Sequence, residues 1–238
     1  MNANLEFTID GAFDAIKDTL AKVFRSEEIT ALEYMSLNTV AQVFCLSNER
    51  SKNGGLMYEA IIRFLRQFIS EKAAQIGALT TPVDRLLEYK SAWENFKKSA
   101  EGTDGMFSYL NKNWMKQAAD NEAFKSGDKK LYFVKALCMV IWMEDMFKKM
   151  SGVIIQSALA VLKEGEDGVE GAQVDLVKVV LDSLVEMSTE GVSIMDTCKR
   201  IGLYDQDVFL DEDTDEEEED KLPEDPRQQL LAFEKQFQ

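Results

Sequence analysis

The chain has 238 residues, of which 45% are hydrophobic and 29% charged, a composition typical of a globular protein with one large or two small domains. It contains no apolar run of about 18 residues and no signal peptide, so we expect no membrane association. The formal net charge of −16 would repel a phosphate backbone, so we expect no nucleic-acid partner.

Histidine is absent, which excludes Ser-His-Asp and Cys-His catalytic sites and zinc sites with imidazole ligands. Three widely spaced cysteines, Cys45, Cys138 and Cys198, do not form a disulfide framework and favour a reducing compartment, the cytoplasm or the nucleus. No phosphate-binding loop, dinucleotide fingerprint or calcium loop is present. We therefore expect no catalytic residue, metal or cofactor, and no enzyme.

Helical periodicity begins with an apolar stripe over 13–24. Ser26 is then predicted as the N-cap of a second helix that runs to Phe44. The polar stretch "NERSKNGG" at 48–55 predicts a break, after which a third helix ends near Gly77.

Thr81 and Pro82 predict the start of a fourth helix, which continues toward Gly102. Trp93 and Trp142 lie on strongly apolar stripes and are predicted to be core residues. Further helices are predicted over about 106–124, 129–163, 173–187 and 192–202. The predicted fold class is all-α, with helices long enough to pack as a bundle.

The last 35 residues differ in kind. The segment "DEDTDEEEED" at 211–220 holds nine acidic residues and no basic one, so it repels itself and is predicted to be disordered. We expect limited proteolysis to cut first between Tyr204 and Gln228. The closing residues "RQQLLAFEKQFQ" resume a helical pattern.

Five segments in order carry a resemblance to a known family: "LEYMSLNTVAQVFC", "LLEYKSAWENF", "MFSYLNKNWMKQ", "MVIWMEDMF" and "VDLVKVVLDSLVEM". Together they resemble the first repeat of a cullin, of the type that scaffolds Skp-cullin-F-box (SCF) ubiquitin ligases. "FEKQF" at 233–237 resembles the start of the second repeat.

The resemblance implies a five-helix cullin repeat followed by the acidic segment. The domain organisation that it implies has four parts: a first cullin repeat at 1–165, connecting helices at 166–203, the acidic disordered linker at 204–228, and the truncated start of a second repeat at 229–238. The C-terminal cullin region that binds the RING subunit is not expected here, so no RING partner is expected for this chain.

The function that the resemblance implies is a non-catalytic scaffold in ubiquitin-dependent protein degradation. The second and fifth helices would dock a Skp-type adaptor of the POZ fold, which carries an F-box substrate receptor. The residues implied as adaptor contacts are Tyr34, Met35, Asn38, Lys112, Asn113, Trp114 and Lys116. A chain of this kind is expected to compete with the full-length scaffold when it is abundant.

Several positions depart from the family pattern. Asn38, Val40, Gln42 and Asn113 replace aromatic or histidine residues, which should weaken docking or change the adaptor. The alternative function is a structural helical interaction protein that kept the cullin fold but lost adaptor binding. On periodicity alone Trp114 is also a candidate core residue. Exposure of Tyr34 and Trp114 on one shared face would favour docking, whereas burial of both would favour the alternative.

Overall fold

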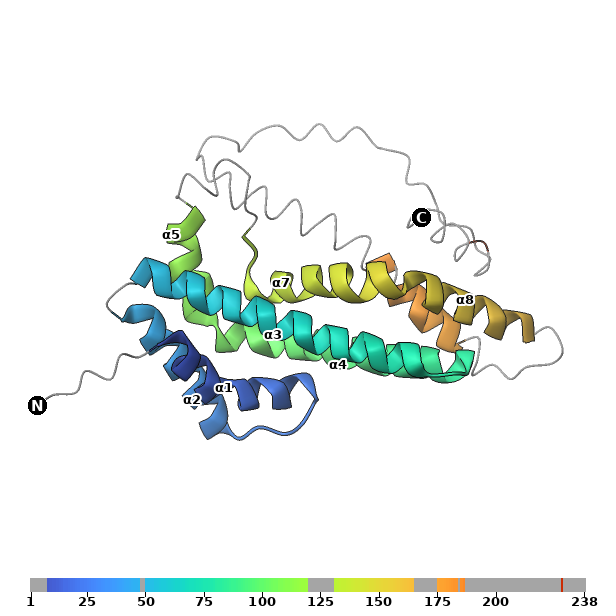
Figure 1. Ribbon diagram of the computed structural model, residues 1–238, viewed down its shortest axis with the longest axis horizontal. Helices are drawn as coiled ribbons and strands as arrows, with labels where there is room; N and C mark the ends of the chain where they lie inside the picture. Colours follow the sequence, from blue (N-terminus) through green and yellow to red (C-terminus); the bar gives the residue numbers. More distant parts are fainter. Residues whose placement is uncertain are drawn as a thin grey trace, which may run out of the picture.

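The computed structural model describes residues 8–47, 50–119, 131–164, 175–183, 185–186 and 228. All regular structure in these residues is helical, which confirms the predicted fold class (Figure 1). The named elements are α1 (Ile9–Phe24), α2 (Ala31–Leu46), α3 (Arg50–Ala78), α4 (Pro82–Met106), η1 (Leu110–Trp114), α5 (Met115–Ala119), α7 (Val134–Ile141), η2 (Trp142–Phe147) and α8 (Lys148–Glu164). The acidic segment 211–220, the rest of the predicted linker up to residue 227 and residues 229–238 lie outside this part of the chain.

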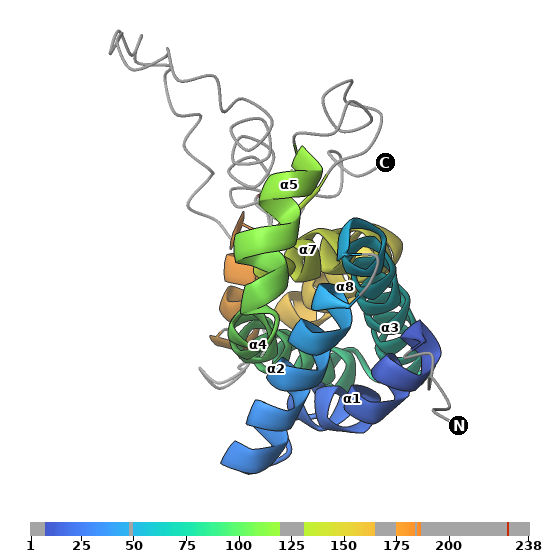
Figure 2. The same cartoon turned by 90° about the vertical axis from the view of Figure 1, so that its left-hand side faces the viewer.

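Three long helical rods run side by side along the molecule: α3, α4, and the continuous run of α7, η2 and α8 (Figure 1). The shorter helices α1 and α2 pack against each other and lie across α3 and α4 near one end. Past Met106, α4 leads through one turn into η1 and α5, which project from the same end of the molecule as α2 (Figures 1 and 2).

The centre of the bundle is an aromatic cluster around Trp142, whose side chain is fully buried. Its ring centroid lies 4.5 Å from that of Phe96 and 5.5 Å from that of Trp93. Tyr89 is also buried there, and its hydroxyl lies 3.2 Å from Oγ of Ser183, which ties segment 175–183 to α4. The prediction that Trp93 and Trp142 are core residues is confirmed.

The turn between α1 and α2 corrects one sequence prediction. Ser26 has a positive φ of 57° after the end of α1, so it is not the N-cap of α2. That role belongs to Thr30, whose hydroxyl accepts a hydrogen bond from the main-chain N–H of Glu33, while the Glu33 carboxylate accepts from the N–H of Thr30. Lys22 of α1 lies 2.6 Å from the same carboxylate. The pKa of Glu33 is lowered to about 2, mainly by the hydrogen bond from Lys22 and then by those from Thr30.

Two predicted helix boundaries are misplaced. α2 and α3 are separate helices, as predicted, but α3 already begins at Arg50, so Gly54 and Gly55 lie inside a helix rather than in the break. α4 passes Gly102 and ends only at Met106. Each glycine costs a helix about 1 kcal/mol relative to alanine, and the burial of side chains such as Phe96 and Met106 outweighs that cost.

Candidate protein-docking surface

The outer face of α2 carries a stripe of exposed hydrophobic side chains. Leu32 is 78% exposed, Met35 65%, Val43 51% and Leu46 38%. Their spacing of three, eight and three residues places them on one side of the helix. Four of the six large hydrophobic side chains that are exposed in the described residues therefore belong to one helix. We call Leu32, Met35, Val43 and Leu46 the α2 stripe.

The opposite face of α2 is apolar, because Leu37, Ala41 and Phe44 are buried against the bundle, whereas the α2 stripe is interspersed with the exposed, uncharged Ser36, Thr39 and Gln42. The only charged residue in the helix is Glu33, which is engaged in the capping box and the ion pair with Lys22. A helix that lies on the surface of a globular protein normally has one polar face. Burial in the bundle accounts for one apolar face of α2, and the α2 stripe has no partner within the described residues.

The sequence-predicted contacts on α2 divide into two groups. Met35 is exposed on the α2 stripe, as a docking residue requires. Tyr34 and Asn38 are only partly exposed, because both turn toward the junction between α4 and η1. A Cβ built on Gly105 would lie 2.7 Å from the Tyr34 hydroxyl oxygen, and Nδ2 of Asn38 donates a hydrogen bond of 2.8 Å to the carbonyl of Met106.

The second part of the predicted site lies on a π-helix, η1, and on α5 directly after it. Lys112, Asn113 and Lys116 are all exposed, and the Asn113 amide donates to the carbonyl of Tyr109 at 3.3 Å. Short π-helical turns are frequent at functional sites because they re-aim the side chains that follow. The two lysines are one helical turn apart and place positive charge on an otherwise acidic chain.

Trp114 is not part of the exposed surface, which corrects the expectation that it faces a partner. Its side chain is 6% exposed, and its ring centroid lies 5.5 Å from that of Tyr58. It fits against α3 at Gly54, where a built Cβ would lie only 2.1 Å from Cδ1 of the indole ring. Trp114 therefore fixes η1 to α3, and the polar residues around it in sequence occupy the other side of the helix.

α2 and the η1 segment lie next to each other at one end of the molecule (Figure 2). The hydrogen bond from Asn38 to the carbonyl of Met106 joins α2 to the end of α4, shortly before η1 begins. The apolar α2 stripe and the exposed lysines of η1 and α5 therefore belong to the same end of the molecule. Sequence reasoning named Met35 and the lysines but not Leu32, Val43 or Leu46, although a helix with one charged residue and hydrophobic residues on both sides was a visible signal.

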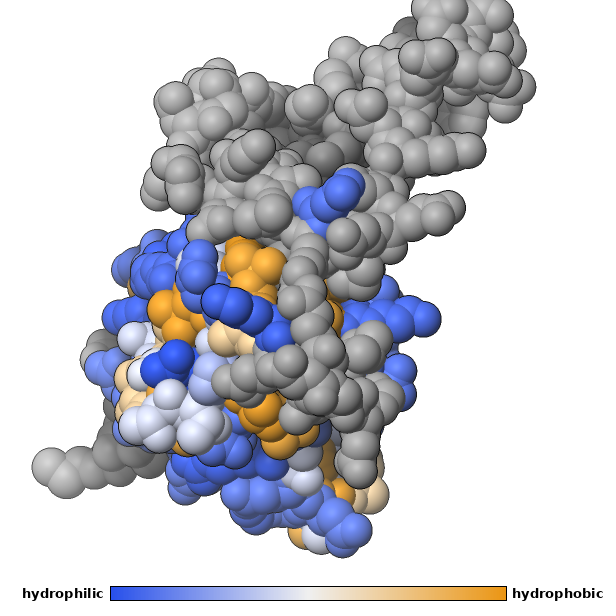
Figure 3. All heavy atoms as spheres, turned by 90° about the vertical axis from the view of Figure 1, so that its right-hand side faces the viewer, coloured by the Kyte–Doolittle hydropathy of each residue, from blue (hydrophilic) through white to orange (hydrophobic). Residues whose placement is uncertain are grey.

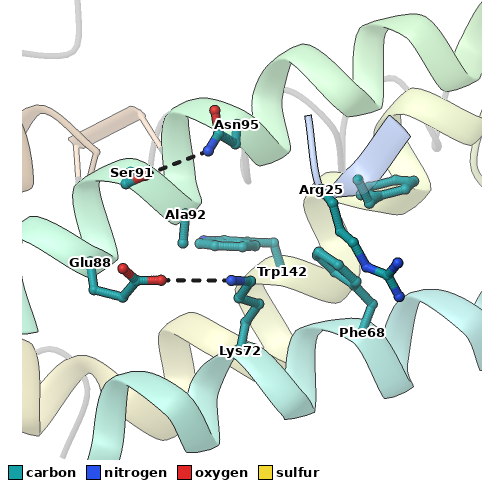
Figure 4. A pocket seen from close by; sticks show the side chains of 9 residues that line it. Arg25, Phe68, Lys72, Glu88, Ser91, Ala92, Asn95 and Trp142 are labelled. Carbon is teal, nitrogen blue, oxygen red and sulfur yellow. Dashed lines mark hydrogen bonds and ion pairs between the residues drawn. The ribbon is translucent and has the colours of Figure 1, made fainter. Parts of the chain in front are cut away.

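The pocket beside Trp142 offers no competing site. Its volume is about 90 Å³, and Trp142 and Phe68 form part of its lining (Figure 4). Lys72 and Glu88 approach to 3.6 Å across it, and Arg25 also lines it.

The described residues also contain no group of three acidic or cysteine side chains that could hold a metal ion. None of the helices described has the length and apolarity needed to cross a membrane. The opposite end of the bundle shows hydrophobic side chains in separate patches among hydrophilic ones (Figure 3). The surface at α2 and η1 is therefore the candidate functional site.

Comparison with known proteins agrees with the helical architecture. The family model of the Cullin alpha solenoid domain matches residues 13–212. Cullin-1 of Caenorhabditis elegans is 24% identical over 176 residues, which cover 64% of this chain and 22% of that protein. Cullin-1 of Schizosaccharomyces pombe is 22% identical over 195 residues, which cover 76% of this chain and 25% of that protein.

Cell division control protein 53 of Saccharomyces cerevisiae is 22% identical over 151 residues, which cover 57% of this chain and 17% of that protein. In each of these three relatives the matched region is a quarter of the protein or less.

Proposed function

The chain belongs to the cullin family, and from this premise we propose that it is a non-catalytic scaffold module of an SCF-type ubiquitin ligase. In this proposal the surface formed by α2, η1 and α5 docks a Skp-type adaptor of the POZ fold, and the adaptor carries an F-box substrate receptor. The described helices would form the first cullin repeat. The cytoplasm or the nucleus is the compartment that we propose, since Cys45 and Cys138 are free and buried.

The α2 stripe is the observation that carries this proposal. Exposed hydrophobic side chains gathered on one helix mark interaction surfaces, because a monomer gains nothing from leaving them in water. Met35 and Leu32 are the most exposed of them and would bury most area in a complex. A flexible methionine adapts to the shape of a partner, which suits it to the centre of an interface.

The lysines of η1 and α5 complement the apolar stripe. Lys112 and Lys116 are exposed at the same end of the molecule and would meet acidic groups at the rim of an interface, where charge sets orientation and association rate more than affinity. The proposed partner surface is thus an apolar groove with acidic residues at one edge. No RING subunit is proposed as a partner of the helices described.

The alternative, a cullin fold that has lost its adaptor, is favoured by one observation. Trp114 is buried and Asn38 bonds to the main chain, so two of the seven sequence-predicted contacts are used inside the molecule. The criterion set by Tyr34 and Trp114 is met for neither function, because Trp114 is buried and Tyr34 is only partly exposed. The binding experiment below separates the two functions.

The test is calorimetric titration of the chain with a purified Skp-type adaptor. Met35→Glu puts a charge into the α2 stripe, and the loss of binding should be at least about 2 kcal/mol, the scale of an interface hot spot. Leu87→Glu is the matched control, because Leu87 is 50% exposed on α4, outside the α2 stripe. Equal affinities of both variants and the unchanged chain would refute docking at α2, and no binding by the unchanged chain would favour the alternative.

A functional test follows from the same proposal. A chain that binds adaptor and does not position a ubiquitin-conjugating enzyme should occupy the adaptor unproductively and compete by mass action. Added to a reconstituted SCF reaction with limiting adaptor, it should lower substrate ubiquitination in proportion to its concentration. The Met35→Glu variant should inhibit much less, and constant ubiquitination with the unchanged chain would contradict competition.

A further inference from the structure

Asn38 has a different use from the one expected of a docking residue. Its Nδ2 lies 2.8 Å from the carbonyl oxygen of Met106, 3.4 Å from that of Gly105 and 3.5 Å from Oγ of Ser108. A side-chain amide nitrogen has two N–H donors, and here it faces three acceptors of one segment. The donor side of Asn38 is therefore occupied inside the molecule and not available to a partner.

The segment that Asn38 holds is the end of α4, where helix geometry leaves carbonyl groups without partners. The last four carbonyls of an α-helix have no donor from the next helical turn. Gly105 and Met106 are the last two residues of α4, and the N–H of Phe107 reaches the Gly105 carbonyl but not that of Met106. η1 begins only at Leu110. The Asn38 amide thus acts as a C-terminal cap supplied by another helix.

The same junction is anchored on a second side, to α7. Oδ1 of Asp104 accepts hydrogen bonds from Nδ2 of Asn111 at 2.7 Å and from the main-chain N–H of Lys135 at 3.1 Å. Oδ1 of Asn111 accepts from the main-chain N–H of Val134 at 3.0 Å. These bonds fix η1 against α7 independently of α2. Loss of the Asn38 hydrogen bonds should therefore loosen the junction against α2, where the Tyr34 hydroxyl still lies beside Gly105, without unfolding the bundle.

We infer that Asn38 is a positioning residue. By hydrogen bonding to the α4–η1 junction, it sets the spacing between the α2 stripe and the two lysines, Lys112 and Lys116. This inference rests on the proposed docking function. Two parts of one surface contribute together only when they are held at the spacing that the partner requires. Without the Asn38 hydrogen bonds, a partner bound to the α2 stripe would lose its contact with the lysines.

The first arm of the test needs no partner. Hydrogen exchange of the amides of 105–116 is compared between the unchanged chain, Asn38→Asp, which keeps the shape but removes both donors, and Asn38→Gln, which keeps them. Exchange in Asn38→Asp should be about fivefold faster, the factor expected for one lost hydrogen bond, with partial recovery in Asn38→Gln. Asn38→Ala and the exposed neighbour Thr39→Ala serve as second variant and control. Unchanged exchange in 105–116 overturns the inference.

The second arm is a double-mutant cycle with the Skp-type adaptor, in which Lys112→Ala/Lys116→Ala is measured in the unchanged chain and in Asn38→Ala. The increase in the dissociation constant caused by the two lysine substitutions should be at least about threefold smaller in the Asn38→Ala background, because the effects of mutations at coupled residues are not additive. Equal lysine effects in both backgrounds overturn the positioning role while docking stands. Failure of the unchanged chain to bind the adaptor refutes the proposed function and, with it, the positioning role. Faster amide hydrogen exchange in Asn38→Asp would still establish that Asn38 holds the α4–η1 junction.

Discussion

α1 and α2 are helices of equal length, 16 residues each, that pack against each other, yet their outer faces differ. The charged residues of α1 are Asp10, Asp14, Lys17, Asp18 and Lys22, and its buried face is apolar. α2 buries a comparable face but has Glu33 as its one charged residue and exposes the α2 stripe. Packing among the described residues uses one apolar face of each helix, so it does not account for the exposed hydrophobic side chains on the outer face of α2.

The same distinction separates the residues of η1 and α5. Trp114 is directed inward to α3, whereas Lys112 and Lys116 are directed outward. The inward residues hold these helices on the bundle, and the outward residues are exposed and can contact a partner. Each prediction below tests whether a residue belongs to the first group or to the second.

The largest effect is expected for Trp114. Trp114→Ala removes a buried aromatic side chain and should lower the free energy of unfolding by about 3–5 kcal/mol. Lys112→Ala in the same turn should change it by no more than about 0.5 kcal/mol. Urea denaturation followed by circular dichroism measures both. If Trp114→Ala kept full stability and lost only adaptor affinity, Trp114 would be a contact and our assignment would be wrong.

A matched leucine pair tests α1 against α2 directly. Leu20 of α1 is buried and Leu32 of α2 is exposed. Leu20→Ala should destabilise the fold by about 2–5 kcal/mol, whereas Leu32→Ala should stay within about 0.5 kcal/mol. Adaptor affinity should respond to Leu32→Ala. Similar losses of stability in the two variants would show that the outer face of α2 packs on part of this chain.

Gly54 and Gly55 form a second matched pair, since both lie in α3 and face the Trp114 ring at different distances. A Cβ on Gly54 would lie 2.1 Å from Cδ1 of Trp114, but a Cβ on Gly55 would lie 3.6 Å from its nearest ring atom, an ordinary contact. Gly54→Ala should cost about 1–3 kcal/mol by overpacking, and Gly55→Ala should gain up to about 1 kcal/mol in helix propensity. Thermal unfolding of the two variants measures the difference, and equal midpoints would contradict the close approach of Trp114.

The smallest effect is expected at Glu33, which joins α1 to α2. Hydrogen bonds from Lys22 and Thr30 lower its pKa to about 2 from an ordinary 4.5. A carboxyl group whose pKa is lowered on folding stabilises the protein above its unfolded pKa, and this contribution is lost as the pH falls through the folded value. The stability difference between the unchanged chain and Glu33→Gln should therefore be constant above about pH 5 and shrink toward pH 2. A difference that does not vary with pH would show that Glu33 is not paired in solution.

Local signals in the sequence predicted much of the fold. Thr81 and Pro82 start α4 as expected, and apolar periodicity identified Trp93 and Trp142 as core residues. The capping box at Thr30 was also visible, because glutamate follows three residues later, whereas Ser26 has no such partner. That error came from choosing the wrong capping residue rather than from missing information.

The remaining errors have a tertiary cause. Gly54 was interpreted as part of a turn because glycine favours turns, and only Trp114, sixty residues later, explains a glycine inside α3. Likewise, Asn38 was expected at an interface, but it bonds to a carbonyl 68 residues away. Contacts of this range leave no local pattern in a single sequence. The exposure of Met35, by contrast, agrees with the prediction made from the family resemblance.

The most direct test of the central claim is a methyl NMR titration of the chain with a Skp-type adaptor. The methyl groups of Leu32, Met35 and Val43 report on the α2 stripe, and those of Leu87 and Val153 report on other exposed apolar positions. We expect the first three signals to shift or broaden in proportion to the bound fraction, with the other two unchanged. Perturbation of Leu87 and Val153 with an unchanged α2 stripe would contradict the account.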